Sequence, residues 1–188
     1  MRIISGNLKG RKIALSNSNN TRPLKDLTKE SIFNILQHSH LIKIIFKKSS
    51  ILDLFSGVGS FGLECISRGS KNVIFWENFP ETIKILKKNI SELKCENKTD
   101  VITENIFNIK KKYNFKKKKF EIIFIDPPFK EKKIINLLED IIHLNILKKN
   151  GVIIMHRHKN ENEIYPKKFN IIKIKTYGIS KIIFGLIS

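Results

Sequence analysis

Cysteine is scarce in this chain of 188 residues, which contains only Cys65 and Cys95. The two are far apart in the sequence, have no CxxC spacing, and are not accompanied by a cluster of histidines. A cysteine-based metal site is therefore disfavoured, and we expect no bound metal. A reducing, cytoplasmic setting is the corresponding default for the protein.

Long hydrophobic runs are also absent. No apolar run approaches the ~20 residues that a helix needs to cross a bilayer. Residues 1–6 lack the apolar centre of a signal peptide, so we expect no membrane partner. A chain of this length is large enough for one substantial hydrophobic core but small for two. We therefore expect a single domain, and a monomer.

Acidic residues are few: 17 Asp and Glu stand against 36 Lys and Arg, which gives a formal net charge of +19. Such an excess favours a polyanionic partner. Arginine is rare while lysine, isoleucine and asparagine are abundant, so part of this charge could reflect the codon usage of an AT-rich genome. Nucleic acid remains the favoured interpretation because the acidic residues have not risen to match.

The most informative stretch is an apolar run that ends in an acid, two prolines and an aromatic residue. The run at residues 120–125 is short and rich in β-branched and aromatic residues, which predicts a strand buried on both faces. Pro127 and Pro128 cannot donate to a sheet ladder and must end the strand. They also restrict the residues before them, which holds Asp126 at the carboxyl end of the strand. Open α/β sheets bind their ligands at that edge.

This stretch is suited to present a planar amine. The Asp126 carboxylate and the Pro127 carbonyl are acceptors that could bind both protons of an –NH2 group. Phe129 offers a flat face on which a base could stack. The alternative is a rigid loop with a solvated acid.

A second motif follows the apolar strand predicted at residues 51–55. Gly57, Gly59 and Gly62 form a G-x-G-x-x-G pattern between that strand and a helix, which is the context in which the pattern is informative. We expect Gly57 to permit a tight turn, Gly59 to let a ligand approach the backbone, and Gly62 to let the helix pack on the strand.

Two polar residues follow the next two predicted strands. Glu77 comes directly after residues 72–76 and could accept both hydroxyls of a ribose. Asn105 comes just after residues 101–103, where its amide could bond an adenine edge or cap a helix. Together with the glycine pattern, they indicate an adenosine-type cofactor without specifying which one.

The first residues of the chain carry several cations. Residues 1–14 alternate weakly around two glycines and predict a projecting β-hairpin arm. On such an arm Arg2, Arg11 and Lys12 would suit phosphate contact. The alternative is a lysine-coated edge that prevents aggregation.

The remaining segments are read from their apolar periodicity. Residues 21–48 predict a helical segment, including a second helix at 41–46, with Arg22 held beside Pro23 ahead of the first helix. Further on we expect a helix at 134–147, a fifth strand at 151–155, surface positions for residues 156–158 and a terminal antiparallel hairpin.

Taken together these motifs resemble the RsmD family, the 16S rRNA (guanine(966)-N2)-methyltransferases of bacteria. The similarity covers nearly the whole chain. It rests on the N-terminal Arg-Ile-Ile-Ser-Gly, on Thr-Arg-Pro at 21–23, on Leu-Asp-Leu-Phe-Ser-Gly at 52–57 and on Asp-Pro-Pro-Phe at 126–129. One departure is His156, at the end of the fifth strand, where relatives often carry an acid.

The resemblance implies a Rossmann-like class I methyltransferase that uses S-adenosyl-L-methionine. The implied α/β fold is a seven-stranded mixed sheet of order 3-2-1-4-5-7-6, with helices on both faces and an N-terminal β-hairpin arm. Within the single domain 1–188, residues 1–20 would form the arm, 21–48 the helical segment and 49–188 the catalytic core.

The resemblance also implies roles for particular residues and a partner, the 16S rRNA of the small ribosomal subunit. The implied cofactor-binding residues are Asp53, Phe55, Gly57, Gly59, Gly62, Glu77 and Asn105. The target amine would meet Asp126, Pro127, Pro128 and Phe129, and RNA would meet Arg2, Arg11, Lys12 and Arg22.

Three other functions fit parts of the sequence. DNA adenine-N6 methylation uses the same Asp-Pro-Pro-Phe chemistry, although the chain leaves little room for a separate DNA-recognition domain. An NAD-dependent dehydrogenase would use the glycine pattern and Glu77 but gives no role to residues 126–129. A non-catalytic RNA-binding module would bind RNA without cofactor.

Overall fold

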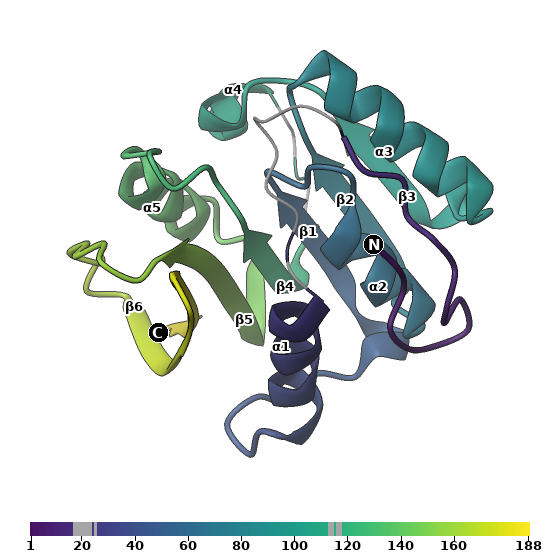
Figure 1. Cartoon of the computed structure of the whole chain (residues 1–188). Helices are drawn as coiled ribbons and strands as arrows, with labels where there is room; N and C mark the ends of the chain where they lie inside the picture. The colour runs from purple at the N-terminus through teal and green to yellow at the C-terminus, as the bar shows by residue number, and fades with distance from the viewer. Residues whose placement is uncertain (17–23, 25, 113–114, 116–117) are drawn as a thin grey trace.

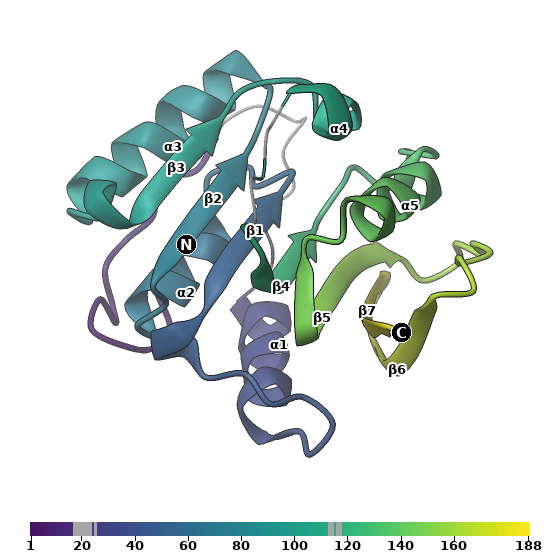
Figure 2. The same cartoon turned by 180° about the vertical axis from the view of Figure 1, so that it is seen from behind.

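The computed structural model describes every residue except 17–23, 25, 113–114 and 116–117. Its centre is one seven-stranded sheet of order β3-β2-β1-β4-β5-β7-β6, as predicted (Figures 1 and 2). The strands are β1 (Ser50–Leu54), β2 (Asn72–Trp76), β3 (Thr99–Ile102), β4 (Phe120–Ile125), β5 (Leu147–His158), β6 (Phe169–Tyr177) and β7 (Ser180–Ile187). Strands β1 to β5 are parallel to one another, whereas β7 runs antiparallel to both β5 and β6.

Helices cover both faces of the sheet, also as predicted. They are α1 (Asp26–His38), α2 (Ser60–Ser67), α3 (Pro80–Glu92), α4 (Ile109–Lys112) and α5 (Ile134–Leu144), with 3₁₀ turns at Phe46–Lys48, Glu96–Lys98 and Ile106–Asn108. The buried apolar residues form two clusters. One joins α1, α2 and α3 to a face of the sheet, and the other joins α4 and α5 to the opposite face. No helix of the described residues is long and apolar enough to cross a membrane.

The register of the central strands brings the predicted site residues to one edge of the sheet. Leu54 at the end of β1 pairs with Trp76 of β2 on one side and with Ile125 of β4 on the other. Glu77 and Asp126 each follow directly after these partners. The carboxyl ends of three parallel strands therefore present their polar residues side by side.

The N-terminal segment pairs with itself only briefly and does not project. A single antiparallel bridge joins Arg2 to Lys12, in place of the two strands we expected. Both Ile3 and Ile13 are buried in the core beside the helices. The apolar residues of this hairpin are removed from water only if it lies against the domain, which is why it is docked rather than extended.

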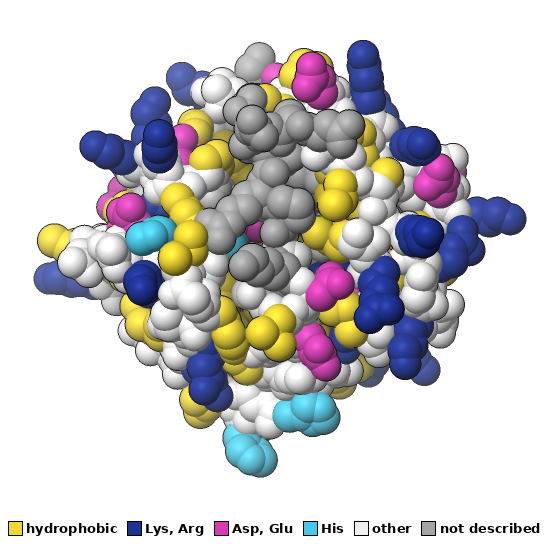
Figure 3. Space-filling view, in the orientation of Figure 1, with side chains coloured by type: hydrophobic (Ala, Val, Ile, Leu, Met, Phe, Trp, Pro, Cys, Tyr) yellow, Lys and Arg dark blue, Asp and Glu magenta, His cyan; other side chains and the backbone are white. Residues whose placement is uncertain are grey.

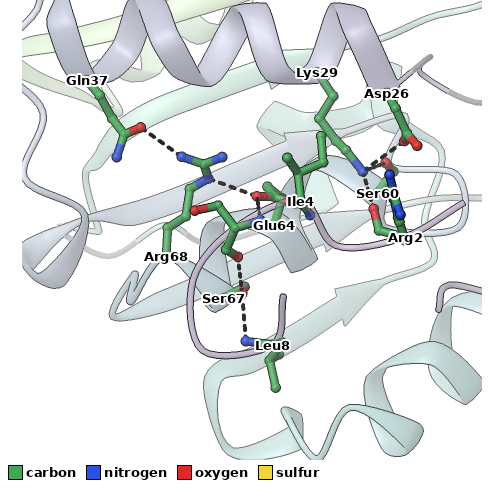
Figure 4. Close-up of polar contacts among 11 residues, drawn as sticks. Arg2, Ile4, Leu8, Asp26, Lys29, Gln37, Ser60, Glu64, Ser67 and Arg68 are labelled. Atoms are coloured by element: carbon green, nitrogen blue, oxygen red, sulfur yellow. Dashed lines mark hydrogen bonds and ion pairs between the residues drawn. The ribbon is translucent and has the colours of Figure 1, made fainter. Parts of the chain in front are cut away.

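Polar contacts with α2 fix the docked hairpin (Figure 4). The Glu64 carboxylate accepts hydrogen bonds from the backbone N–H groups of Ile4 at 2.7 Å and Ser5 at 3.0 Å. The buried Lys29 of α1 donates to the carbonyl of Arg2 at 2.8 Å. The hairpin is therefore held by its backbone, which leaves its cationic side chains exposed.

Two helix predictions need correction. Residues 41–45 form a turn and extended backbone, and only the 3₁₀ turn Phe46–Lys48 follows. So short a segment gains too few intrahelical hydrogen bonds to offset the cost of nucleating a helix. The helix predicted at 134–147 ends at Leu144, because Asn145 takes a left-handed conformation (φ 50°) that ends it. The next two residues complete the crossover from β4, and Leu147 opens β5.

Candidate active site

A cavity of about 590 Å³ opens where the carboxyl ends of β1, β2, β4 and β5 meet. The structure brings most of the predicted cofactor and catalytic residues to its wall: Asp53, Phe55, Gly57, Glu77, Asp126, Pro127, Pro128 and Phe129. Phe61 of α2 and Phe124 of β4 line it too, with ring centroids 4.1 Å apart in a stacked pair. One concave site therefore unites the two motifs that lie some seventy residues apart in the chain.

Gly57 and Gly59 both take left-handed conformations, but the open approach for a ligand that we expected at Gly59 is found at Gly57. Gly57 lines the cavity at φ 55°, and a Cβ atom there would meet nothing within 4 Å. Gly59, at φ 87°, faces inward, where a Cβ would lie 2.6 Å from Leu86 of α3. Gly57 is therefore the position open to a ligand, and Gly59 permits helix packing instead.

Gly62 has the packing role we expected for it. A Cβ atom on Gly62 would lie 2.3 Å from the ring of Phe75 on β2, so no larger residue fits there without displacing α2. Its backbone N–H donates to the Asp53 carboxylate at 2.9 Å. Gly62 thus allows α2 to lie close to the sheet and ties the helix to the end of β1.

Asp53 is a buried acid with one unsatisfied oxygen. It is only 1% exposed, and its Oδ1 atom has no hydrogen-bond partner among the described residues. Burial raises its pKa well above the ordinary value, and the nearby charges of Asp126 and Glu77 act in the same direction, against the Gly62 hydrogen bond. Such a group is ready to receive a polar ligand atom.

Glu77 binds backbone as well as facing the cavity. Its Oε2 accepts from the N–H of Gly57 at 2.8 Å, and its Oε1 accepts from those of Asn78 at 2.8 Å and Phe79 at 2.9 Å. A carboxylate has about four lone-pair sites. Three are used, which leaves capacity for one hydroxyl in this arrangement rather than the two we expected.

Phe55 and Asn105 differ in where they lie. Phe55 lines the cavity in a left-handed conformation (φ 57°) that is unfavourable for a bulky residue, and its ring meets Phe107 edge-to-face at 5.9 Å. Asn105 does not line the cavity; its side chain caps the 3₁₀ turn Ile106–Asn108 by accepting from Phe107 at 3.0 Å. The helix-cap alternative for Asn105 is therefore the one observed, and its adenine contact stays a prediction.

The Asp-Pro-Pro-Phe segment is held at both ends. The N–H of Asp126 donates to the carbonyl of Leu54 at 3.2 Å, and the carbonyl of Pro128 accepts from Glu131 at 2.9 Å. In the described part of the chain, no backbone N–H donates to the carbonyl of Pro127. Asp126 and Pro127 both line the cavity, and the joint action of their carboxylate and carbonyl on an amine stays a prediction.

His156 and Arg157 were wrongly expected at the surface, whereas His158 is half-buried. His156 is 4% exposed and Arg157 is 1% exposed, because β5 continues through His158 and pairs there with β7. His156 lines the cavity, and its Nδ1 lies 2.8 Å from Oδ1 of Asp126. The signal was available: β5 was predicted beside β4, so its end had to lie next to Asp126.

Arg157 supports the same loop from the other direction. Its Nε donates to the carboxylate of Glu163 at 2.7 Å, and Nη2 donates to the carbonyl of Glu131 at 2.9 Å. The Tyr165 hydroxyl donates to Glu163 at 2.7 Å, and burial together with that carboxylate raises the pKa of Tyr165. This buried network holds the segment that follows Pro128.

The predicted RNA-binding cations fall into two groups. Arg2, Arg11 and Lys12 are exposed on the docked hairpin, where Arg11 also donates to the carbonyl of Glu92 at 2.7 Å. Arg22 lies outside the described residues. Figure 3 shows lysine and arginine side chains around the outline of one face, with hydrophobic side chains nearer its centre. In the described ranges no cluster of three or more His, Cys, Asp or Glu side chains could hold a metal ion.

Comparison with known proteins identifies the family. The family model described as "Conserved hypothetical protein 95" matches residues 1–185. The chain belongs to the RsmD family. Its relatives include the ribosomal RNA small subunit methyltransferase D of Buchnera aphidicola from Acyrthosiphon pisum, 39% identical over 92% of this chain and 86% of that one. The protein of the same name from Haemophilus influenzae is 36% identical over 95% and 90% of the two chains.

A solved structure agrees with the RsmD assignment. A protein from Haemophilus influenzae, named a "putative methylase", superposes with a TM-score of 0.77 at 30% identity, covering 98% of this chain and 96% of that one. The methyltransferase fold is therefore shared over almost the entire length, the docked hairpin included.

Proposed function

We propose that this RsmD-family protein transfers a methyl group from S-adenosyl-L-methionine to the exocyclic N2 of a guanine in small-subunit rRNA. The observation that carries the proposal is the pair of acceptors at the cavity, the Asp126 carboxylate and the Pro127 carbonyl, beside a glycine turn open to a ligand. The names of the relatives support the rRNA substrate. Guanine 966 as the target, and N2 as the methylated atom, follow from family resemblance.

The residues at the cavity fit S-adenosyl-L-methionine. Gly57 leaves open space where a side chain would stand, and the buried Asp53 Oδ1 and Ser56 Oγ atoms have no partners in the described part of the chain. We assign the amino-acid end of the cofactor to Asp53 and the glycine turn, and one ribose hydroxyl to Glu77. The cofactor, when bound, supplies a methyl group on a positively charged sulfur.

Asp126 and Pro127 act on the amine. The lone pair of the guanine amine is delocalised into the ring, which makes it a poor nucleophile. Hydrogen bonds from its two protons to the carboxylate and the carbonyl favour a pyramidal nitrogen whose lone pair points towards the methyl donor, and orientation of this kind can account for a large part of the rate. As the N–C bond forms and the S–C bond breaks, the nitrogen becomes acidic and gives one proton to Asp126, which releases it to solvent.

The guanine must leave its stack to enter the cavity. Phe129 lies at the cavity wall beside the acceptors and offers a face to the base. Base–aromatic stacking of this kind is worth about 1–3 kcal/mol. The exposed cations of the hairpin, Arg2, Arg11 and Lys12, are proposed to contact rRNA phosphates.

One experiment tests the function directly. The protein is incubated with methyl-labelled S-adenosyl-L-methionine and small ribosomal subunits that lack the modification, and the labelled nucleotide is mapped. We expect one labelled guanine in the 16S rRNA. Label in a DNA oligonucleotide but not in the subunits would favour adenine-N6 methylation of DNA. Tight binding of NAD would favour a dehydrogenase, and RNA binding without cofactor affinity would favour a non-catalytic module.

A further inference from the structure

His156 lies directly beside the proposed catalytic acid. The parallel pairing of β4 with β5 aligns Ile125 with Met155, so the next residues, Asp126 and His156, are neighbours at the edge of the sheet. On its other side His156 pairs with Ile182 of β7. The backbone of His156 is thus fixed by β7, one residue beyond the last pair with β4, and its buried side chain lines the cavity.

The hydrogen bond between the two side chains determines the state of the ring. Nδ1 of His156 lies 2.8 Å from Oδ1 of Asp126. An ionised carboxylate can only accept, so Nδ1 carries the proton, and in the neutral ring Nε2 is then an acceptor. This Nε2 is buried without a hydrogen-bond partner among the described residues. None of the hydrogen bonds of those residues uses the second oxygen of Asp126.

The imidazole ring is also fixed by aromatic contact. The ring of Phe129 meets His156 edge-to-face, with centroids 5.3 Å apart and planes at 85°. The same Phe129 ring meets His158 at 5.3 Å and 74°. His156 therefore cannot turn without displacing the aromatic residue proposed to stack on the base, and its proton is held in line with Asp126.

We propose that His156 is a positioning residue that fixes the Asp126 carboxylate for methyl transfer. Its Nδ1–H holds Oδ1, which turns the other carboxylate oxygen towards the target amine. His156 keeps its proton throughout, because the proton released by the methylated nitrogen passes to Asp126 and then to solvent. This inference rests on the proposed function and adds to it a residue outside the Asp-Pro-Pro-Phe motif.

Three variants separate positioning from packing. His156→Leu fills the space but cannot donate a hydrogen bond. His156→Asn keeps an N–H donor at the same number of bonds from the backbone as Nδ1. His143→Asn makes the same change at an exposed position on α5, away from the cavity, and serves as the matched control. For each variant we would measure kcat and KM for unmodified small subunits, the Kd for S-adenosyl-L-methionine and the melting temperature.

We expect His156→Leu to lower kcat about 10- to 100-fold, since small errors in orientation cost rates of that order. Its KM for subunits and its cofactor Kd should change less than about threefold, because the lost interaction acts in the transition state. His156→Asn should restore kcat to within about threefold of wild type, and the control should match wild type. Nitrogen-15 NMR of the wild-type protein should show the His156 ring protonated at Nδ1.

Two kinetic results would overturn the role of His156 alone: a wild-type kcat in His156→Leu, or a kcat in His156→Asn as low as in His156→Leu. An Nδ1 atom that carries no proton in the NMR spectrum would do the same. A wild-type protein that methylates no subunits would instead overturn the proposed function, and this inference with it. Activity of the wild-type protein thus distinguishes the two failures.

Discussion

Two buried carboxylates lie at the short helix α2 and differ in how they are paired: Glu64 belongs to the helix, and Asp53 at the end of β1 accepts from its Gly62 N–H. Glu64 is 0% exposed and has a full set of partners: two backbone N–H groups of the hairpin and the Arg68 side chain, which donates at 2.9 Å. Asp53 is buried almost as completely, but it accepts one hydrogen bond, has an oxygen without a partner and lies near two other acids.

This difference separates a structural acid from one prepared for a ligand. A buried charge is costly unless it is paired and hydrogen-bonded, so natural structures tolerate an unsatisfied one mainly at functional sites. Other polar groups near the docked hairpin and at the cavity differ in the same way. Asn89 of α3 bonds Ala14 and Val58 of the docked N-terminal segment and glycine turn, whereas the cavity leaves Ser56 Oγ and His156 Nε2 without partners in the described ranges.

The largest effect is expected on the cavity side of this comparison. Asp126→Ala removes a proposed acceptor of the amine protons, so methyl transfer should fall by roughly 10³-fold or more. Cofactor affinity should stay close to wild type, whereas the melting temperature should fall by a few degrees, because the buried Nδ1–H of His156 loses its acceptor. Single-turnover methylation, calorimetric titration and thermal unfolding measure the three quantities. Retained activity would remove the assignment of the site.

Glu64→Ala should lower the stability of the protein and leave methyl transfer unchanged. It leaves Arg68 and the hairpin N–H groups without their acceptor, and breaking a buried pair in this way destabilises a protein by about 3 kcal/mol. Urea unfolding followed by circular dichroism measures the loss, and activity per folded molecule should be preserved. Glu92→Ala is the control, since its pair with Lys88 is exposed at 3.7 Å and should contribute less than about 1 kcal/mol. Equal stabilities of the two variants would contradict the comparison.

Glu77→Gln tests a residue that accepts hydrogen bonds from the backbone and also lines the cavity. The –NH2 group of the glutamine amide donates and cannot accept, so one of the two former carboxylate oxygens is lost as an acceptor. The variant must therefore lose a backbone contact at Gly57 or Phe79, or the ribose hydroxyl. We expect the Kd for S-adenosyl-L-methionine to rise about tenfold, the order expected when a hydrogen bond to a charged group is lost. Titration calorimetry decides, and an unchanged Kd would place the ribose elsewhere.

The smallest effect is a gain in stability. Asp53→Asn keeps an acceptor for Gly62 and removes the buried charge. Because the pKa of Asp53 is raised in the folded protein, the wild-type acid loses stability as pH rises from the ordinary carboxyl value near 3.8 through the folded pKa. The variant should melt about 2–4 °C higher at pH 8 and no higher at pH 4. Its cofactor affinity should fall. A variant that is less stable than wild type at pH 8 would mean that the charge of Asp53 does not destabilise the folded protein.

The sequence predicts the sheet well because its signals are local and strong. Apolar strands, an acid with two prolines and a glycine turn each mark where a parallel strand must end, and the strand order then brings Asp126 near Gly57. The open position was expected at Gly59 and is found at Gly57, because the pattern does not state which way each Cα faces. That depends on Leu86 of α3, which is far along the chain.

Tertiary contacts account for the other errors. His156 and Arg157 carry polar side chains typical of a surface, but their burial depends on β7, which pairs with β5 from the far end of the sequence. The hairpin was expected to project because its cations are evident in the sequence. Its backbone hydrogen bonds to Glu64 are not evident there, because the sequence does not show whether an acid is exposed or buried.

The eight-residue helix α2 joins two events that the mechanism needs. Its first turn lines the cavity that we propose binds the methyl donor, and its last turn holds the cationic hairpin through Glu64 and Ser67. If rRNA shifts the hairpin on arrival, that movement travels little more than two helical turns before it reaches the donor. By thermodynamic reciprocity, a protein already loaded with donor would then hold its RNA differently, by the same factor, as an empty one.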